Sequence, residues 1–358
     1  MIKKILKMTG IVIAAVLLTA ISYVAYVFIS YSRIPDMQPL DTYGKPSEDA
    51  VTTGTEYTIV TQNCGFGAYD QDFTFFMDGG KQSWADDKET VIKDTDLASE
   101  EILSHDPDFI LLQEVDTDST RSYHVNQVER FASSFEGFCS VFSMNYHSAF
   151  LMYPPLQPHG KSNSGILTLS KTGITSSMRR SLPISEGFSK ILDLDRCYSV
   201  SRIPVDNGKE FILYNIHASA YGGSDTVRTG QMTMLLNDMK SEYDKGNYCL
   251  CGGDFNHDFP GNSRSWFGSG VMDSVGWAHP FPVDLIPEGI SQCLDYDDDR
   301  HIATCRNCDV PYGPDCQTVV VDGFLISDNI SCTELHNIDA AFIYSDHNPV
   351  EMKFELKD

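Results

Sequence analysis

Apolar runs that meet carboxylate, amide or imidazole side chains recur along most of this chain. Near the C-terminus, Asp346 and His347 directly precede Val350–Leu356, where apolar and charged residues alternate. This alternation is the period-two pattern of a half-buried strand. Upstream, four runs end in the same kind of residue and a fifth meets Asp322 and continues to Ser327. They are Tyr57–Gln62 before Asn63, Phe109–Leu112 before Gln113 and Glu114, Phe211–Tyr214 before Asn215 and His217, Tyr248–Gly253 before Asp254 and Asn256, and Val319–Val321.

Helix-like segments separate these predicted strands. One runs from Asp96 to His105, and another runs from a capping Asp225 to Lys245 and stops at Gly246. Alternating strands and helices indicate an α/β fold, in which side chains at strand ends meet at one solvent-open edge. Carboxylates, histidines and asparagines gathered there would suit a hard cation and phosphate chemistry.

In this order, the motifs resemble those of the endonuclease/exonuclease/phosphatase superfamily, the DNase I-like proteins. The resemblance covers Thr52 to the C-terminus and implies a four-layer sandwich of two packed mixed β-sheets flanked by helices. It also implies a role for each matching residue. Asn63, Glu114 and Asp346 would sit at the divalent metal, Asn215 and His217 would contact the scissile phosphate, Asp254 and Asn256 would handle the attacking water and the transition state, and Asp322 would orient His347.

The chemistry of these residue types agrees with the resemblance. Phosphoester hydrolysis needs neutralised phosphoryl oxygens, an oriented water and help for the leaving oxygen. Mg²⁺, or alternatively Mn²⁺, suits the first task, and Glu114 is the best protein ligand. Asp254 and His347 both remain candidates for the general base.

Each residue also has a structural interpretation when it is taken alone. Asn63 and Asn256 fit Asx turns after strands, Glu114 fits a salt bridge, and His217 fits a partly buried histidine. Only the occurrence of the whole ordered set favours a catalytic site.

The N-terminus predicts a membrane anchor. Residues 8–32 contain no Asp, Glu, Lys or Arg, and the apolar core Ile11–Ile29 matches the roughly 20 residues that cross a bilayer. Lys3, Lys4 and Lys7 precede it, which favours a cytoplasmic N-terminus and an extracellular remainder in a single-pass protein. The alternative is a cleaved signal peptide with a small-residue site at Ala20 and Ser22.

The rest of the chain divides into two parts. Residues 33–54 contain several prolines and no apolar period, which indicates a linker or an edge leader. Residues 55–358 then form one catalytic domain, in a chain that is 42% hydrophobic and long enough to bury a sizeable core. Residues 1–32 hold the cytoplasmic stub and the transmembrane anchor.

Charge bears on the substrate. The formal net charge is −24, and the part beyond Lys7 has 23 basic against 50 acidic residues, or −27. Such a field repels polyanions, and no basic stripe that would follow nucleic acid is visible. A small phosphoester or a lipid head group is therefore favoured over nucleic acid, and no protein partner is evident.

The insert between the Asp254 motif and Asp322 is rich in cysteine. Cys293, Cys305, Cys308 and Cys316 could form disulfides outside the cell, hold a structural zinc, or stay as thiols, and disulfides are the leading prediction. Arg306 and Asn307 in this insert are candidate substrate-binding residues, as are His159 and Lys161 further upstream. The acidic run Asp295–Asp299 is expected to be a solvated loop rather than a calcium site.

Two classes of function remain. The first is a metal-dependent phosphoesterase displayed outside the membrane, with an extracellular DNase I-like nuclease as a variant of it. The second is a surface-displayed binding module that keeps the fold without turnover. The complete set of motifs favours the enzyme.

Overall fold

Two mixed seven-stranded β-sheets form the centre of the protein. The computed structural model describes residues 2–185, 190, 195–220, 225–267, 276–295 and 301–358. The first sheet has the order β15 (Ile330–Asn337), β16 (Val350–Leu356), β3 (Glu56–Asn63), β4 (Phe109–Asp116), β6 (Asn163–Ser170), β5 (Cys139–His147), β2 (Thr42–Gly44). The second has the order β1 (Gln38–Leu40), β7 (Ser176–Ser181), β8 (Cys197–Pro204), β9 (Glu210–His217), β10 (Tyr248–Asp254), β14 (Asp322–Ser327), β11 (Ile290–Cys293).

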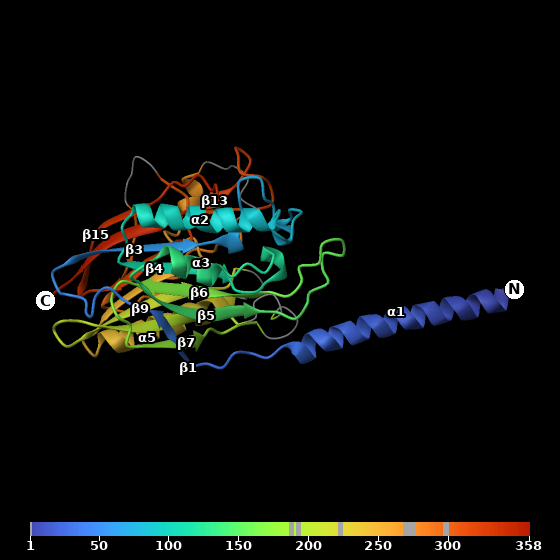
Figure 1. Ribbon diagram of the computed structural model, residues 1–358, viewed down its shortest axis with the longest axis horizontal. Coiled ribbons are helices and arrows are strands. Elements are labelled where there is room, and N and C mark those ends of the chain that lie inside the picture. The colour runs from blue at the N-terminus through green and yellow to red at the C-terminus, as the bar shows by residue number, and fades with distance from the viewer. Residues whose placement is uncertain (1, 186–189, 191–194, 221–224, 268–275, 296–300) are drawn as a thin grey trace.

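The sheets pack through an aromatic core, and helices cover their outer faces. Phe109, Phe211 and Phe354 meet between the sheets and are fully buried. On the outside of the first sheet lie α2 (Lys88–Ser104) and α3 (Gln127–Ser134), while α5 (Asp225–Tyr243) packs on the second. The result is the expected four-layer α/β sandwich (Figure 1).

Most of the predicted elements are present, with shifted boundaries. Helix α2 begins eight residues before the expected Asp96 because the Asp87 side chain accepts a hydrogen bond from the Thr90 backbone N–H and caps it there. The run Val319–Val321 does not continue into the residues after it as a single strand, contrary to the expectation from the sequence. Its first residue ends β13 (Thr318–Val319), which pairs with β12 (Cys305–Arg306), and β14 starts only at Asp322.

The N-terminal helix α1 (Ile2–Ser30) is long and apolar enough to cross a membrane, with a mean hydropathy of 2.4 over its most apolar window. It extends away from the domain (Figure 1). In the following segment, expected to be a linker or an edge leader, β1 and β2 pair with the edges of the two sheets. Val51 of the same segment is fully buried in the core between the sheets.

All ten cysteines are free thiols in the structure. The insert was expected to be crosslinked within its own group of four. Instead, Cys293 on the edge strand β11 interacts with Cys332 on the edge strand β15, outside that group, and this interaction raises the pKa of Cys293 and lowers that of Cys332. Of the acidic run Asp295–Asp299, residues 296–299 lie outside the described residues.

Candidate active site

Three of the predicted site residues form a row across adjacent strands. In the parallel pair β9 and β10, His217 lies opposite Asp254, and in the antiparallel pair β10 and β14, Asp254 lies opposite Asp322. The close packing of these strands needs the glycine before Asp254. Gly253 has a φ of +142°, and a Cβ atom there would lie 2.1 Å from the Ile216 carbonyl oxygen.

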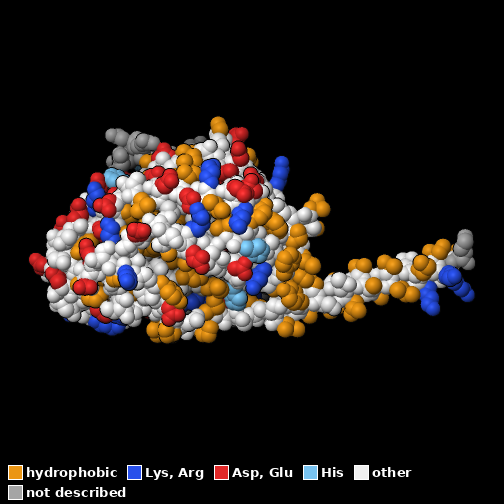
Figure 2. Space-filling model, in the orientation of Figure 1, with side chains coloured by type: hydrophobic (Ala, Val, Ile, Leu, Met, Phe, Trp, Pro, Cys, Tyr) orange, Lys and Arg blue, Asp and Glu red, His pale blue; other side chains and the backbone are white. Residues whose placement is uncertain are grey.

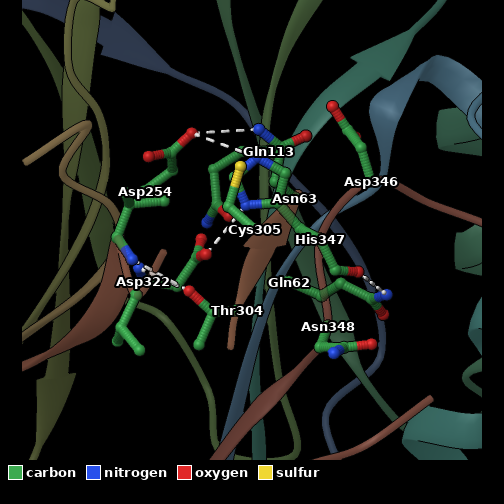
Figure 3. A network of polar contacts seen from close by, with 12 residues as sticks. Gln62, Asn63, Gln113, Asp254, Thr304, Cys305, Asp322, Asp346, His347 and Asn348 are labelled. Carbon is green, nitrogen blue, oxygen red and sulfur yellow. Dashed lines mark hydrogen bonds and ion pairs between the residues drawn. The ribbon is translucent and has the colours of Figure 1, made fainter. Parts of the chain in front are cut away.

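The first sheet places Asn63 and Glu114 against this row. Asn63 ends β3, and its amide Nδ2 donates to Asp254 Oδ2 at 3.0 Å (Figure 3). Glu114 lies in a bulge of β4, where the pairing with β6 shifts register, and has a φ of +53°. Bulges beside active sites re-aim a side chain. Here the bulge brings Glu114 Oε1 to 4.0 Å from His217 Nε2.

Asp254 is the centre of the polar network. Its Oδ1 accepts from the Asn256 backbone N–H at 2.8 Å, and its Oδ2 also accepts from Asn256 Nδ2 at 3.2 Å. Asn256 has a φ of +50°, which folds its amide back toward the strand end. Burial, followed by the negative charge of Asp322, raises the pKa of Asp254 to about 7.

His347 is held by Asp322, as the sequence predicts. Its Nδ1 donates to Asp322 Oδ2 at 2.8 Å, which leaves Nε2 4.0 Å from Asp254 Oδ2. Burial alone would lower the pKa of His347, but the Asp322 carboxylate outweighs burial and the pKa rises well above its ordinary value. The fixed imidazole therefore directs its second nitrogen toward Asp254.

His217 has a different environment. Its Nε2 lies 3.5 Å from Asp254 Oδ2, and its Nδ1 is buried without a hydrogen-bond partner among the described residues. Burial, together with the positive charges of Arg196, His347 and Arg121, lowers its pKa well below the ordinary value. The two histidines at the site are thus electrostatically distinct.

A cavity of about 110 Å³ opens above these residues. Asn63, Glu114, His217, Asp254, Asn256, Asp346 and His347 all line it. These side chains, which come from both sheets, therefore face one common space.

Asn215 does not contact this cavity, contrary to its expected role in phosphate binding. Its Oδ1 accepts from Gln113 Nε2 at 2.8 Å, and its Nδ2 donates to the Leu167 carbonyl oxygen at 3.1 Å. Asn215 lies two residues before the end of β9 and is fully covered by the facing sheet. Its amide joins the two sheets, whereas His217 reaches the open edge.

Arg306 and Asn307 do line the cavity. Arg306 is 1% exposed, and its Nη2 donates to the backbone carbonyl oxygen of Asp70 at 2.6 Å. Its Nε and Nη1 have no oxygen acceptor among the described residues. A buried guanidinium with unused donors suits a phosphate oxygen.

Two cavity residues carry no signal in the sequence. Arg121, in the 3-10 turn Thr120–Ser122, and Arg196, just before β8, line the cavity, although no local motif marks them. Arg121 is fixed by a two-point pairing with Asp116 and lies 3.8 Å over the Phe66 ring. His159, a candidate substrate-binding residue from the sequence, lies in the loop between β5 and β6 and also lines the cavity.

The donor set fits a divalent cation. Asp254, Asp322 and His347 place ligand atoms within 4.8 Å of one another. Asp322 and His347 also share the hydrogen bond described above. Asp346 and Glu114 add further oxygen atoms to the same cavity. Burial, with the charge of Glu114, raises the pKa of Asp346 to about 6. A cation would relieve this crowding of buried carboxylates.

The sequence of the chain matches the model of the Endonuclease/Exonuclease/phosphatase family over residues 60–347. This protein belongs to that family. A comparison with curated proteins finds no match. The matched residues extend from β3 to His347 and thus include the whole row of His217, Asp254 and Asp322.

Solved structures share the fold at low sequence identity. An endonuclease/exonuclease/phosphatase from Beutenbergia cavernae is 14% identical, with a TM-score of 0.54 over 84% of this chain and 72% of that chain. ANGEL2, described as a 2′,3′-cyclic phosphatase, is 15% identical, with a TM-score of 0.55 over 89% of this chain and 99% of that chain. TDP2 from D. rerio, complexed with a single-strand DNA product, is 13% identical, with a TM-score of 0.51 over 84% of this chain and 99% of that chain.

Proposed function

We propose that the protein is a divalent-cation-dependent phosphoesterase whose catalytic domain is displayed outside the membrane. The observation that carries this proposal is the convergence of Asp254, His217 and His347 on one cavity that Glu114 and Asp346 also line. A surface binding module would not need two imidazoles and three carboxylates around one cavity.

Each residue has a defined task in this proposal. Glu114, Asp346 and Asn63 would hold Mg²⁺ or Mn²⁺, and the bound cation would neutralise charge on the phosphoryl oxygens. Asp254 accepts hydrogen bonds on both oxygens and lies where it can orient an attacking water and take its proton.

The remaining polar groups would stabilise and position the transferred phosphoryl group and the leaving oxygen. Asn256 is held by its bonds to Asp254 and to the Ala218 carbonyl oxygen, and adds an uncharged polar side chain at the transferred group. His347 presents Nε2 to the same space because Asp322 occupies its other nitrogen. His217, whose lowered pKa favours the neutral imidazole, can donate a hydrogen bond to the leaving oxygen.

Helix α1 supports the proposed location. The three lysines before its apolar run favour an N-terminus in the cytoplasm and a domain on the opposite side. We propose an uncleaved single-pass anchor, because the apolar run continues beyond the possible cleavage site at Ala20 and Ser22.

The proposed substrate is a small or lipid-borne phosphoester. Arg306, Arg121 and Arg196 give the cavity positive charge for one phosphate group. The exported part nevertheless carries −27 formal charges, which repel a long polyanion. ANGEL2, a cyclic phosphatase, and TDP2, crystallised with a DNA product, share the fold, and fold likeness alone does not choose between these substrates.

A substrate panel tests this preference. We expect kcat/KM for an aryl phosphodiester or a lipid phosphoester to exceed that for duplex DNA by about tenfold or more, because DNA binding needs cations along the duplex. The panel would include inositol phosphates and sphingomyelin with Mg²⁺ at two ionic strengths. Efficient DNA cleavage that falls steeply with salt would restore the nuclease interpretation.

A further inference from the structure

The loop between β5 and β6 presents apolar side chains to solvent. Leu156 is 100% exposed, Tyr153 67% and Met152 58%, and Phe150 is also exposed. The loop is folded rather than loose, because Leu151 and Gly160 exchange backbone hydrogen bonds of 2.9 and 3.0 Å across its base. A soluble surface rarely shows such a cluster without a partner.

The same loop is bonded to the end of α1. Tyr23 Oη accepts from the Met152 backbone N–H at 2.8 Å and donates to the Phe150 carbonyl oxygen at 3.2 Å. Tyr26 Oη accepts from the Phe150 backbone N–H at 3.3 Å. Both tyrosines lie within the last two to three turns of the helix, where aromatic side chains favour the membrane interface. The loop therefore lies at interfacial depth.

The cavity lies at this end of the domain, because Asn63 at the end of β3 lines it. In Figure 1 the arrow of β3, which ends at Asn63, points toward the side from which α1 leaves. Figure 2 shows hydrophobic side chains gathered at that end, next to the helix. At the base of the loop, His159 is 4% exposed and lines the cavity. One short loop thus joins the membrane side to the site.

We propose that the tip Phe150–Leu156 docks into the bilayer that holds α1 and presents the cavity to phosphoesters in lipid head groups. This inference rests on the proposed function and names its substrate class. Continuity with the apolar helix identifies the occupant as lipid rather than protein, since a bilayer holding α1 already contacts the tip. The head-group phosphate would enter the cavity while the acyl chains stay in the membrane.

The kinetic test uses the full chain in phosphatidylcholine vesicles that contain the lipid substrate. We expect the double variant Tyr153→Ser, Leu156→Ser to have a kcat/KM for the vesicle substrate that is lower by about tenfold, because the loss of apolar burial weakens docking. Its rate on the soluble ester bis(p-nitrophenyl) phosphate should stay within about twofold of the parent. The control is Val283→Ser, which changes an equally apolar side chain that is 55% exposed outside the loop. Equal losses on both substrates would overturn the inference.

A second readout does not depend on turnover. In Leu156→Trp, brominated lipids in the same vesicles should quench the fluorescence of the introduced tryptophan. In Val283→Trp they should leave the fluorescence of the introduced tryptophan unchanged. Absence of quenching at residue 156 would refute docking. If the tryptophan fluorescence of Leu156→Trp is quenched but only soluble esters are hydrolysed, the lipid substrate class is refuted. If no ester of any kind is hydrolysed, the proposed function is refuted, while quenching would still support docking.

A separate observation concerns the open edges of the two sheets. Strands β11 and β15 are edge strands of different sheets, and Cys293 ends the first while Cys332 lies in the second. The two thiols interact, since each shifts the pKa of the other. Cys332 stands at a β-bulge, is exposed, and donates to the Glu334 carbonyl oxygen at 3.6 Å. Ile330 of β15 packs with Cys293 in the core between the sheets.

The structure assigns Cys293 and Cys332 as a disulfide site. In an oxidising compartment, this disulfide would crosslink the edge strands of the two sheets. Two thiols would lose two protons and two electrons to a disulfide oxidant such as oxidised glutathione, which would be reduced to two thiols. Cys332 would form the first mixed disulfide because it is accessible, and the thiolate of Cys293 would then displace glutathione.

Peptide mapping tests this pairing. After equilibration with oxidised glutathione and alkylation, we expect a Cys293–Cys332 crosslink in the full chain and in Cys316→Ser, and none in Cys332→Ser. Reduction should lower Tm by about 5 °C or more in the unsubstituted protein and leave Cys332→Ser unchanged. Two alkylated thiols at these positions, or a crosslink to Cys305, Cys308 or Cys316, would overturn the assignment.

Discussion

Asp254→Asn should lower kcat/KM by about a thousandfold or more, within the range expected for loss of a group that handles protons in the transition state. The carboxylate lies at the centre of the network, 3.5 Å from His217 and 4.0 Å from His347. An amide of the same shape cannot accept the proton of an attacking water. The measurement is steady-state hydrolysis of an aryl phosphodiester with saturating Mg²⁺.

The matched control is Asp94→Asn on α2. Asp94 is also buried, and burial likewise raises its pKa to about 7, but it does not line the cavity. We expect full activity from Asp94→Asn. Its Tm should be equal or higher, because a carboxylate with a raised folded-state pKa destabilises the fold above its unfolded pKa. Asp254→Asn should stay within a few degrees of the parent in Tm. If it retained activity, Asp254 would have no role in the chemistry.

The positions of several candidate site residues could be predicted because they end central strands. Asn63, Asp254 and His217 each follow an apolar run, and the parallel pairs β3 with β4 and β9 with β10 carry these ends to one edge. The pairing of His347 with Asp322 also follows the motif, and its geometry is confirmed. The individual catalytic roles stay predictions.

The parts that could not be predicted depend on the distance between the sheets and on loops. Asn215 and His217 share one face of β9, and only packing decides that the first is covered and bonded to Gln113. Arg121 and His159 reach the cavity from loops whose course no periodic pattern encodes. The pairing of Cys293 with Cys332 depends on which strands end the two sheets.

The proposed cation dependence gives the second large effect. Removal of divalent cations with EDTA should lower hydrolysis by about a hundredfold or more, because the phosphoryl charge would then face the carboxylates of Glu114, Asp254 and Asp346 without compensation. Glu114→Gln should weaken binding of Mn²⁺, measured by electron paramagnetic resonance. Glu101→Gln, a helix-surface change, should leave this binding unchanged.

One Mg²⁺ titration tests the proposed cation dependence. The full-length protein is stripped with EDTA, and kcat/KM for an aryl phosphodiester is measured as Mg²⁺ is added back. We expect negligible hydrolysis at the start and full recovery at saturation, with a higher half-saturating Mg²⁺ concentration in Glu114→Gln. Full activity in the chelated protein would contradict the metal-dependent site on which the proposed function stands.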